Sequence, residues 1–182
     1  IGVRLVGSEM CIRDRTKTIY LFYSFSFLPW VGISVALLWS FYNLIRKKIS
    51  FGKVLEVNRF LRRHWSVTGK VIKGDKRGRK IGFPTCNIKP NNYIIPKLGV
   101  YCVNVETKHF KKKGIANIGY RPTFKGQNLL LEVNIFGINK NLYNKEIKVN
   151  FIRFIRSEKK FKGLEQLKKQ IKIDIIQAKK NV

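Results

Sequence analysis

The sequence predicts an all-β protein, built as a small closed or nearly closed β-barrel with one helix at its C-terminal end. From Trp65 onward, short runs rich in β-branched and aromatic residues are separated by clusters of Gly, Pro and Asn, which is the pattern of strands joined by tight turns. Five or six such runs fall within roughly 90 residues, and closing so small a sheet removes its exposed edges. The chain has 182 residues, 45% of them hydrophobic, which suffices for one core but not for a second full domain.

The predicted strands cover residues 66–72, 99–106, 110–118, 129–136 and 147–155, with turns at 91–92, 97–99 and 137–144. A C-terminal helix is predicted over residues 164–179, because apolar residues recur there at helical spacing and lysines occupy the opposite face. Its apolar face consists of Leu164, Leu167, Ile171 and Ile175. We expect this helix to pack across one side of the barrel.

The first 43 residues do not share the barrel pattern, and we interpret them as an artefactual or non-native segment. The chain begins at Ile1, its one methionine is Met10, and residues 6–15 resemble translated adapter sequence, so we expect the chain to be a fragment. Residues 19–45 carry no charge and have basic flanks, which also fits a transmembrane helix at about residues 20–42. Pro29, Gly32 and several serines weigh against that alternative. Residues 44–61 return to an amphipathic pattern, which predicts two short helices broken at Gly52.

The chain is strongly basic, with 38 Lys and Arg against 10 Asp and Glu and a formal net charge of +28. Such a field attracts polyanions, which include nucleic acid, anionic lipid and nucleotide phosphates. An AT-rich coding sequence, which favours Lys, would give the same composition without a functional meaning. The three cysteines are far apart and the chain has two histidines, so the sequence predicts neither a disulfide framework nor a zinc site. A reducing, cytoplasmic location is therefore expected.

The densest signal for chemistry lies between Gly74 and Asn87. Gly74, Gly78 and Gly82 allow the backbone to approach a ligand closely, and four cations would neutralise a polyphosphate: Lys76, Arg77, Arg79 and Lys80. The segment is not a Walker A loop, and an ordinary hairpin loop has the same composition.

Thr85 and Asn87 sharpen the prediction, because in an extended segment residues two apart point to the same face. A hydroxyl and an amide oxygen beside a phosphate-binding loop suit Mg²⁺, which takes few protein ligands and keeps several waters. Cys86 points the other way and is expected to pack rather than react.

Two further segments carry candidate site residues. Glu132 and Asn134 alternate with Leu131, Val133 and Ile135, so the carboxylate either faces solvent or lines a pocket, where partial desolvation would suit it to act as a general base. After the last predicted strand, Arg156, Glu158 and Phe161 could hold a planar polar ligand by hydrogen bonding and stacking. The alternative is that Ser157 or Glu158 caps a helix.

Taken together, these segments closely resemble the riboflavin kinase family. The matching motifs occur in order along about 115 residues: residues 66–71, 74–87, 99–101, 114–124, 131–136 and 154–161, followed by the helix ending near Asp174. Residues 65–182 thus resemble the kinase module of the bacterial bifunctional enzymes that make FMN and FAD, truncated at its N-terminus. Residues 44–63 resemble the end of the adenylyltransferase domain that precedes this module.

The resemblance implies a six-stranded Greek-key barrel, with a C-terminal helix and a short helical N-terminal remnant. It implies transfer of the ATP γ-phosphate to the ribityl 5′-hydroxyl of riboflavin, with Mg²⁺, giving FMN and ADP. By position, Gly74 and Arg79 would lie in the ATP-covering flap, Thr85 and Asn87 would contact Mg²⁺ and phosphate, and Glu132 would be the catalytic base. Arg156, Glu158 and Phe161 would lie in the flavin-side flap.

Two positions depart from the family, which usually has Ala at Cys86 and His at Asn134. The nucleotide-binding core of an adenylyltransferase is not recognisable, so we expect no conversion of FMN to FAD. The alternative function is a basic barrel that binds single-stranded nucleic acid, whereas the kinase interpretation predicts no nucleic-acid partner. A membrane partner is expected only if residues 19–45 form a span. The sequence leaves the oligomeric state open.

Overall fold

The computed structural model describes residues 28–74, 77–90, 93–123, 126–138 and 140–180. The predicted adapter-like segment and the first part of the uncharged run lie outside the described residues. Within them the helices are α1 (Leu28–Ser50), α2 (Val54–Leu61), α3 (Arg77–Lys80) and α4 (Leu164–Lys180). The strands are β1 (Ser66–Lys70), β2 (Cys86–Ile88), β3 (Gly99–Glu106), β4 (Lys111–Thr123), β5 (Gly126–Ile135) and β6 (Glu146–Ser157).

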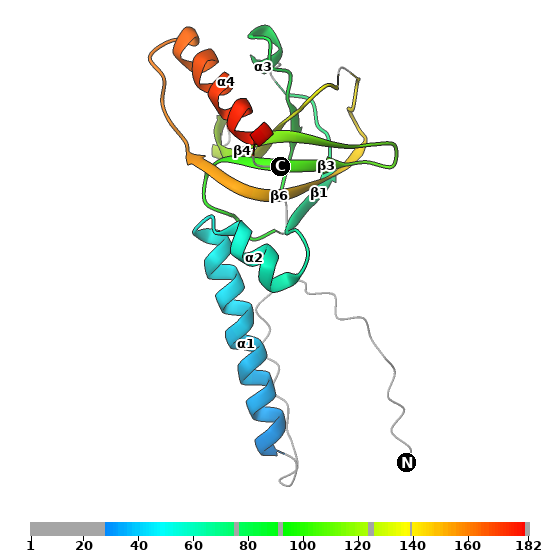
Figure 1. Ribbon diagram of the computed structural model, residues 1–182, viewed down its shortest axis with the longest axis vertical. Helices are drawn as coiled ribbons and strands as arrows, with labels where there is room; N and C mark the ends of the chain where they lie inside the picture. The colour runs from blue at the N-terminus through cyan, green and yellow to red at the C-terminus, as the bar shows by residue number, and fades with distance from the viewer. Residues whose placement is uncertain (1–27, 75–76, 91–92, 124–125, 139, 181–182) are drawn as a thin grey trace.

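The six strands form one antiparallel sheet in the order β1-β6-β3-β4-β5-β2, which curls into a nearly closed barrel (Figure 1). An isolated bridge links the segment after β1 to β2 and so connects the two edges of the sheet. In it the Ile72 amide donates to the Asn87 carbonyl at 2.8 Å. The predicted all-β, six-stranded barrel with a C-terminal helix is therefore confirmed.

The β4–β5 hairpin is longer than the sequence indicated. Residues 119–123 contain Gly119 and Pro122, which disfavour strand, yet the ladder continues to the pair Thr123 and Gly126. Cross-strand pairing outweighs local propensity here. The short strand β2 was also not among the predicted strands, since three residues carry too little alternation to be recognised.

The barrel interior is filled by alternate residues of the strands and by an aromatic cluster. Tyr101 and Phe151 are fully buried with ring centroids 5.1 Å apart. The Trp65 ring lies tilted against Phe151 at 4.7 Å, and Phe154 lies 5.1 Å from Tyr101. The Tyr101 hydroxyl donates to the Lys97 carbonyl, and burial raises the pKa of this phenol. Aromatic contacts of this kind add to the free energy gained by burial.

Helices α1 and α2 close the same core from outside the sheet. Ile49 of α1, with Val54 and Val57 of α2, is buried in the core cluster that fills the barrel. The Asn58 side chain donates to the Phe151 carbonyl at 2.8 Å and accepts from the Trp65 amide at 2.7 Å. Residues 44–63, whatever their origin, are thus an integral part of the barrel's packing.

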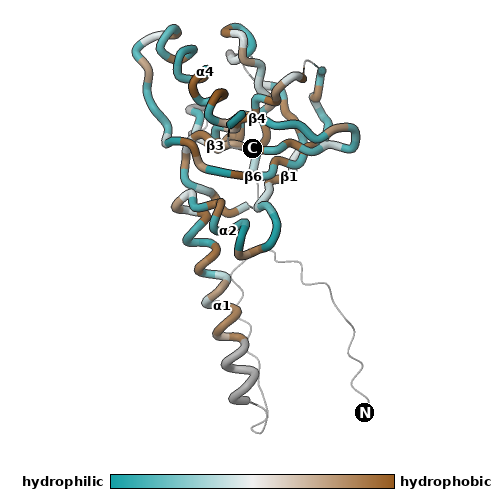
Figure 2. The backbone as a smooth tube through the Cα atoms, viewed as in Figure 1, coloured by the Kyte–Doolittle hydropathy of each residue, from teal (hydrophilic) through white to brown (hydrophobic). Residues whose placement is uncertain are grey.

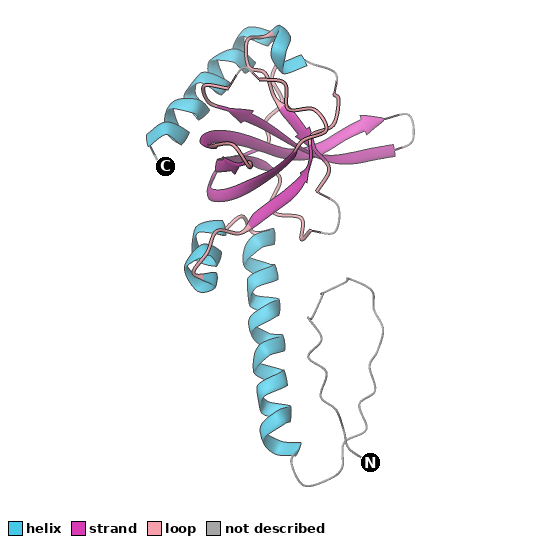
Figure 3. Cartoon of the chain, turned by 90° about the vertical axis from the view of Figure 1, so that its right-hand side faces the viewer, coloured by secondary structure: helices cyan, strands magenta, loops and turns pink. Residues whose placement is uncertain are grey.

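The N-terminal part of α1 extends away from the barrel, opposite the end where α4 lies, as Figures 1 and 3 both show. Figure 2 shows hydrophobic residues in the coloured part of α1, and Leu37, Leu38 and Trp39 are about two-thirds exposed, at 66%, 69% and 66%. No helix among the described residues is long and apolar enough to cross a membrane.

Helix α4 covers the outer face of β3, β4 and β6, as predicted. Ile171, Ile175 and Ala178 pack against Val100, Cys102 and Ile115. Leu164, expected on the packed face, is exposed at the first residue of α4.

Replacing Asn58 by Ala tests whether α2 is integral to the barrel. The change leaves a buried carbonyl and a buried amide without partners, which should lower the free energy of unfolding by about 2–4 kcal/mol. Arg59→Ala, on the exposed face of the same helix, should change it by less than about 0.5 kcal/mol. Urea denaturation measures both, and equal values would show that α2 only rests on the barrel.

Candidate functional site

Three polar side chains lie side by side on the outer face of β2, β5 and β4. Antiparallel pairing places Asn87 opposite Glu132, and Glu132 opposite Asn117, and directly opposed residues share a face. The neighbours of Glu132 along β5, Leu131 and Val133, are fully buried in the barrel, so the Glu132 carboxylate points outward. The predicted division of this strand into two faces is confirmed.

A small recess adjoins this face, which we call the Asn87 recess. It has a volume of about 20 Å³ and is lined by Gly74, Arg79, Thr85, Asn87 and Tyr143. The structure thus brings together the four residues that the sequence predicts for phosphate and metal binding. Tyr143 is an addition from the loop before β6, where an aromatic residue in a polar turn was the only available signal.

The loop before β2 folds into a compact turn that returns to Thr85. Helix α3 is a single turn, and the Phe83 amide donates to the Gly78 carbonyl at 2.8 Å. A Cβ atom on Gly78 would lie 2.4 Å from the Phe83 carbonyl oxygen, so this turn requires glycine. Gly82 has φ +90°, which also favours glycine. The turn therefore holds the exposed side chains of Arg79 and Thr85 at the recess.

The Asn87 amide packs directly over the backbone of Gly74, where a Cβ atom would lie 1.7 Å from Nδ2. The Asn87 Oδ1 atom is buried, and no hydrogen-bond donor among the described residues reaches it. Buried carbonyl oxygens almost always have a partner, and a bound cation supplies one. Oδ1 and the Thr85 hydroxyl are hard oxygens of the type that Mg²⁺ prefers, so the recess fits the predicted metal.

The Glu132 carboxylate is held by Arg121 of β4 in a two-pronged ion pair. Arg121 Nε donates to Oε1 at 3.0 Å and Nη2 donates to Oε2 at 2.9 Å, with the Glu132 side chain 26% exposed. The carboxylate is therefore partly exposed, and the Arg121 guanidinium fixes its orientation. Sequence reasoning missed Arg121, because the partner depends on the extension of the β4–β5 hairpin.

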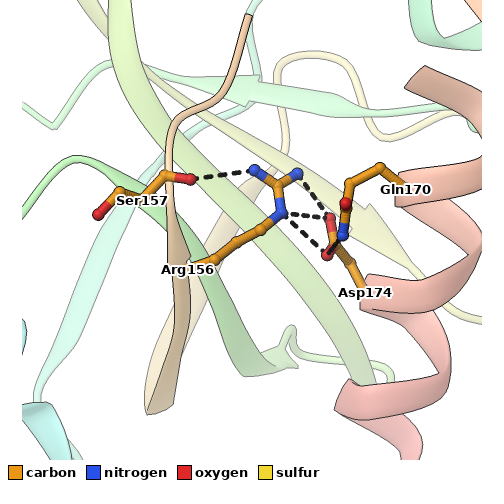
Figure 4. A network of polar contacts seen from close by, with 4 residues as sticks. All are labelled: Arg156, Ser157, Gln170 and Asp174. Atoms are coloured by element: carbon orange, nitrogen blue, oxygen red, sulfur yellow. Dashed lines mark hydrogen bonds and ion pairs between the residues drawn. The ribbon is translucent and has the colours of Figure 1, made fainter. Parts of the chain in front are cut away.

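Arg156, near the end of β6, is fixed by helix α4 (Figure 4). Its Nη2 donates to Asp174 Oδ2 at 2.7 Å and its Nε to Oδ1 at 3.0 Å, while Gln170 also donates to Asp174 at 2.9 Å. Asp174 is 1% exposed. The guanidinium lies 5.8 Å from the centre of the Phe161 ring, close enough for a cation–π contact. The structure thus brings Arg156 and Phe161 together and adds Asp174 as the anchor.

Glu158 lies across β4 at Gly119, where a Cβ atom would meet Glu158 Oε1 at 2.0 Å. Gly119 lies between Asn117 and Arg121 on β4, so Glu158 approaches the strand that contacts Glu132. The alternative that Ser157 or Glu158 caps a helix is wrong, because α4 begins only at Leu164.

Cys86 and Asn134, the two positions that depart from the family pattern, have packing roles. Cys86 packs against the core, and burial raises the pKa of its thiol, which disfavours the nucleophilic thiolate. The Asn134 side chain donates to the Pro84 carbonyl at 2.7 Å and so ties β5 to the segment that carries Thr85.

Comparison with known proteins identifies the matching family. A family model described as riboflavin kinase matches residues 61–182. A bifunctional riboflavin kinase/FMN adenylyltransferase of Bacillus subtilis is 43% identical over 136 residues, covering 72% of this chain and 43% of that protein. The protein of the same description from Haemophilus influenzae is 39% identical over 136 residues, covering 74% of this chain and 44% of that protein. The chain therefore spans less than half the length of these relatives.

A solved structure described as a macrolide-efflux protein from Streptococcus pneumoniae is also similar. It superposes with a TM-score of 0.70 and 35% identity, covering 75% of this chain and 45% of that chain. The similarity supports the same barrel and helices in both proteins.

Replacing Gly74 by Ala should push the Asn87 amide out of the recess. The added methyl group cannot fit beside Nδ2, so we expect displaced Asn87 side-chain NMR resonances and a loss of about 1–3 kcal/mol in stability. Gly163→Ala is the control, because a Cβ atom there meets nothing within 4 Å. Unchanged Asn87 resonances in Gly74→Ala would contradict the close contact.

Proposed function

This chain belongs to the riboflavin kinase family, and we propose that it transfers the γ-phosphate of ATP to the ribityl 5′-hydroxyl of riboflavin, giving FMN and ADP. The observation that carries the proposal is the buried Asn87 Oδ1, which has no partner among the residues that the structure describes. It lies in a recess that also presents Thr85 and Arg79, one strand away from Glu132. The family match does not favour the nucleic-acid-binding alternative.

The glycine turn and Arg79 would hold the phosphates of ATP. The exposed guanidinium of Arg79 can donate to two phosphate oxygens at once. Gly74 and Gly78 leave room for Asn87 and for the turn that places Thr85 at the recess. Thr85 Oγ1 and Asn87 Oδ1 would hold Mg²⁺, which when bound neutralises charge on the phosphate oxygens. Tyr143 would close the recess from the side of β6.

Glu132 would accept the proton of the attacking hydroxyl. The ribityl oxygen forms a bond to the γ-phosphorus, the bond from that phosphorus to the bridging oxygen of ADP breaks, and the hydroxyl proton passes to a Glu132 carboxylate oxygen. Arg121 holds the carboxylate in one orientation through two hydrogen bonds. Phosphoryl transfer needs positioning and one base, so no further catalytic group is required.

The loop that follows β6 would hold the isoalloxazine ring of riboflavin. Phe161 offers an aromatic face and Arg156 a planar cation that Asp174 has already oriented. Glu158 reaches β4 between the residues that flank Glu132, which would bring the ribityl chain toward the base.

Incubating the folded chain with riboflavin, ATP and MgCl₂ and separating the flavins by chromatography tests the proposal. FMN should accumulate in step with ADP, and no FAD should follow. Folded protein that forms no FMN would overturn the proposed function, whereas formation of FAD would overturn only the expectation that adenylyl transfer is absent.

Replacing Glu132 by Gln should lower kcat for FMN formation by about 10²- to 10⁴-fold, because the amide cannot accept the proton. The KM for ATP should change little, since Glu132 does not line the Asn87 recess. Glu165→Gln, a change of the same kind at a side chain 87% exposed on α4, is the matched control and should retain full activity. A Glu132→Gln variant as active as this control would exclude Glu132 as the base.

Thr85→Ala should raise the Mg²⁺ concentration needed for half-maximal activity by about tenfold, because one of two protein oxygens at the metal is lost. The Thr85 side chain is exposed, so the fold should be unaffected. Ser50→Ala, which removes an exposed hydroxyl at the end of α1 and does not line the recess, is the control. An unchanged Mg²⁺ dependence at saturating ATP would show that Thr85 does not hold the metal.

A further inference from the structure

A second cavity lies at the C-terminal end of α2 and shares no lining residue with the Asn87 recess. We call it the Arg62 cleft. It has a volume of about 410 Å³, and its walls include residues from the link between α2 and β1 and from the outer faces of β3 and β6. The side chains that matter for its chemistry are Arg62, Arg63, His64, Glu106, Lys148 and Asn150.

The cleft has an excess of positive charge. Its carboxylate, Glu106, is already neutralised by Lys111 at 2.6 Å and Lys148 at 3.8 Å, and Lys111 holds the pKa of Glu106 below its usual range. No carboxylate of the described residues lies within ion-pair distance of Arg62 or Arg63. Two arginines that follow one another in the chain therefore line one opening without a counter-charge from the described part of the chain, an arrangement that an anion would stabilise.

The backbone of Arg62 gives an independent indication. Arg62 ends α2 in the left-handed conformation, with φ 50° and ψ 22°, and its amide donates to the Arg59 carbonyl. Glycine usually occupies this position, because a Cβ atom disfavours the left-handed region. Among the described residues, the other non-glycine residue with positive φ is Asn144, a residue type that tolerates it. A long cationic side chain thus stands where glycine would give a more stable helix end, and it lines the cleft.

The sheet forms one wall of the cleft, through Glu106 of β3 and Asn150 of β6. Asn150 is 4% exposed and helps to lower the pKa of Glu106, while β6 is fixed by pairing with β1 and β3. The cationic side chains therefore stand on a preorganised base, with an amide and an ion pair already in place, which lowers the entropy lost when a ligand binds.

We propose that the Arg62 cleft is a phosphate-binding site, which takes inorganic phosphate or the phosphate group of an ester. Guanidinium groups match the geometry of phosphate oxygens in paired hydrogen bonds, and a dianion offsets the charge of two arginines better than a carboxylate does. The site is separate from the Asn87 recess and does not depend on the proposed kinase activity.

Titration of the full chain with inorganic phosphate at low ionic strength, followed by amide NMR, tests the proposal. We expect saturable shifts at residues 62–65, Glu106 and Lys148. Arg62→Gly should weaken this phosphate binding by about tenfold, since a charge-assisted hydrogen bond is lost. The same change should raise Tm by about 2–4 °C, because glycine relieves the left-handed conformation. Weaker binding by a more stable protein cannot be explained by unfolding.

Arg59→Gln removes the same charge from the exposed last turn of α2 without touching the cleft, and it should leave phosphate binding unchanged. Arg63→Gln, whose backbone is not left-handed, should weaken binding without raising Tm. The proposal is overturned if phosphate produces no saturable shift at the cleft, shifts only the amides of Gly74 and Asn87, or loses as much affinity in Arg59→Gln as in Arg62→Gly.

Discussion

The closure of the barrel through β2 is the constraint on which the candidate site depends. Three residues, Cys86–Ile88, pair with β5 on one side, while the Asn87 carbonyl accepts from the Ile72 amide on the other. The backbone that closes the barrel therefore carries the side chain that shapes the recess. Because β2 is so short, its register is fixed by the fully buried Ile88 together with this bridge. A slip of one residue would turn Asn87 into the core and Cys86 outward, and the amide oxygen would leave the recess.

The same closure explains the close contact between Gly74 and Asn87 at the recess. Gly74 and Asn87 are pressed together because the strand before the glycine turn and the strand after it meet at the barrel seam. The contact buries Asn87 Oδ1 where no donor among the described residues reaches it, and this is the observation on which the proposed cation site rests. Asn134 acts on the other side of β2, since its hydrogen bond to Pro84 ties β5 to the segment that carries Thr85.

Contacts between neighbours along one strand could be predicted from the sequence, whereas contacts between segments distant in the sequence could not. Thr85 with Asn87, and the outward Glu132 between Leu131 and Val133, follow from the two-residue period of a strand, so the sequence is sufficient for them. Arg121 and Asp174 could not be found in this way. The first meets Glu132 only through a hairpin extended past Gly119 and Pro122, and the second meets Arg156 only because α4 folds back over β6. Periodicity identifies the face on which a side chain lies, whereas the register between distant segments decides what it touches.

The N-terminal boundary of the folded domain likewise could not be predicted from the motifs alone. The motifs indicated a domain beginning at residue 65, and the family model begins at residue 61, yet Val54 and Val57 are fully buried in the core that the strands enclose. An amphipathic helix needs only an apolar stripe, which many sequences satisfy, so the residues of α2 form no recognisable motif although they pack in the core. Asn58 makes the attachment specific, because its amide satisfies the Phe151 carbonyl and the Trp65 amide at the point where β1 begins. The barrel is therefore completed by residues that precede its recognisable motifs, and the Arg62 cleft lies at this junction because α2 must end against β6.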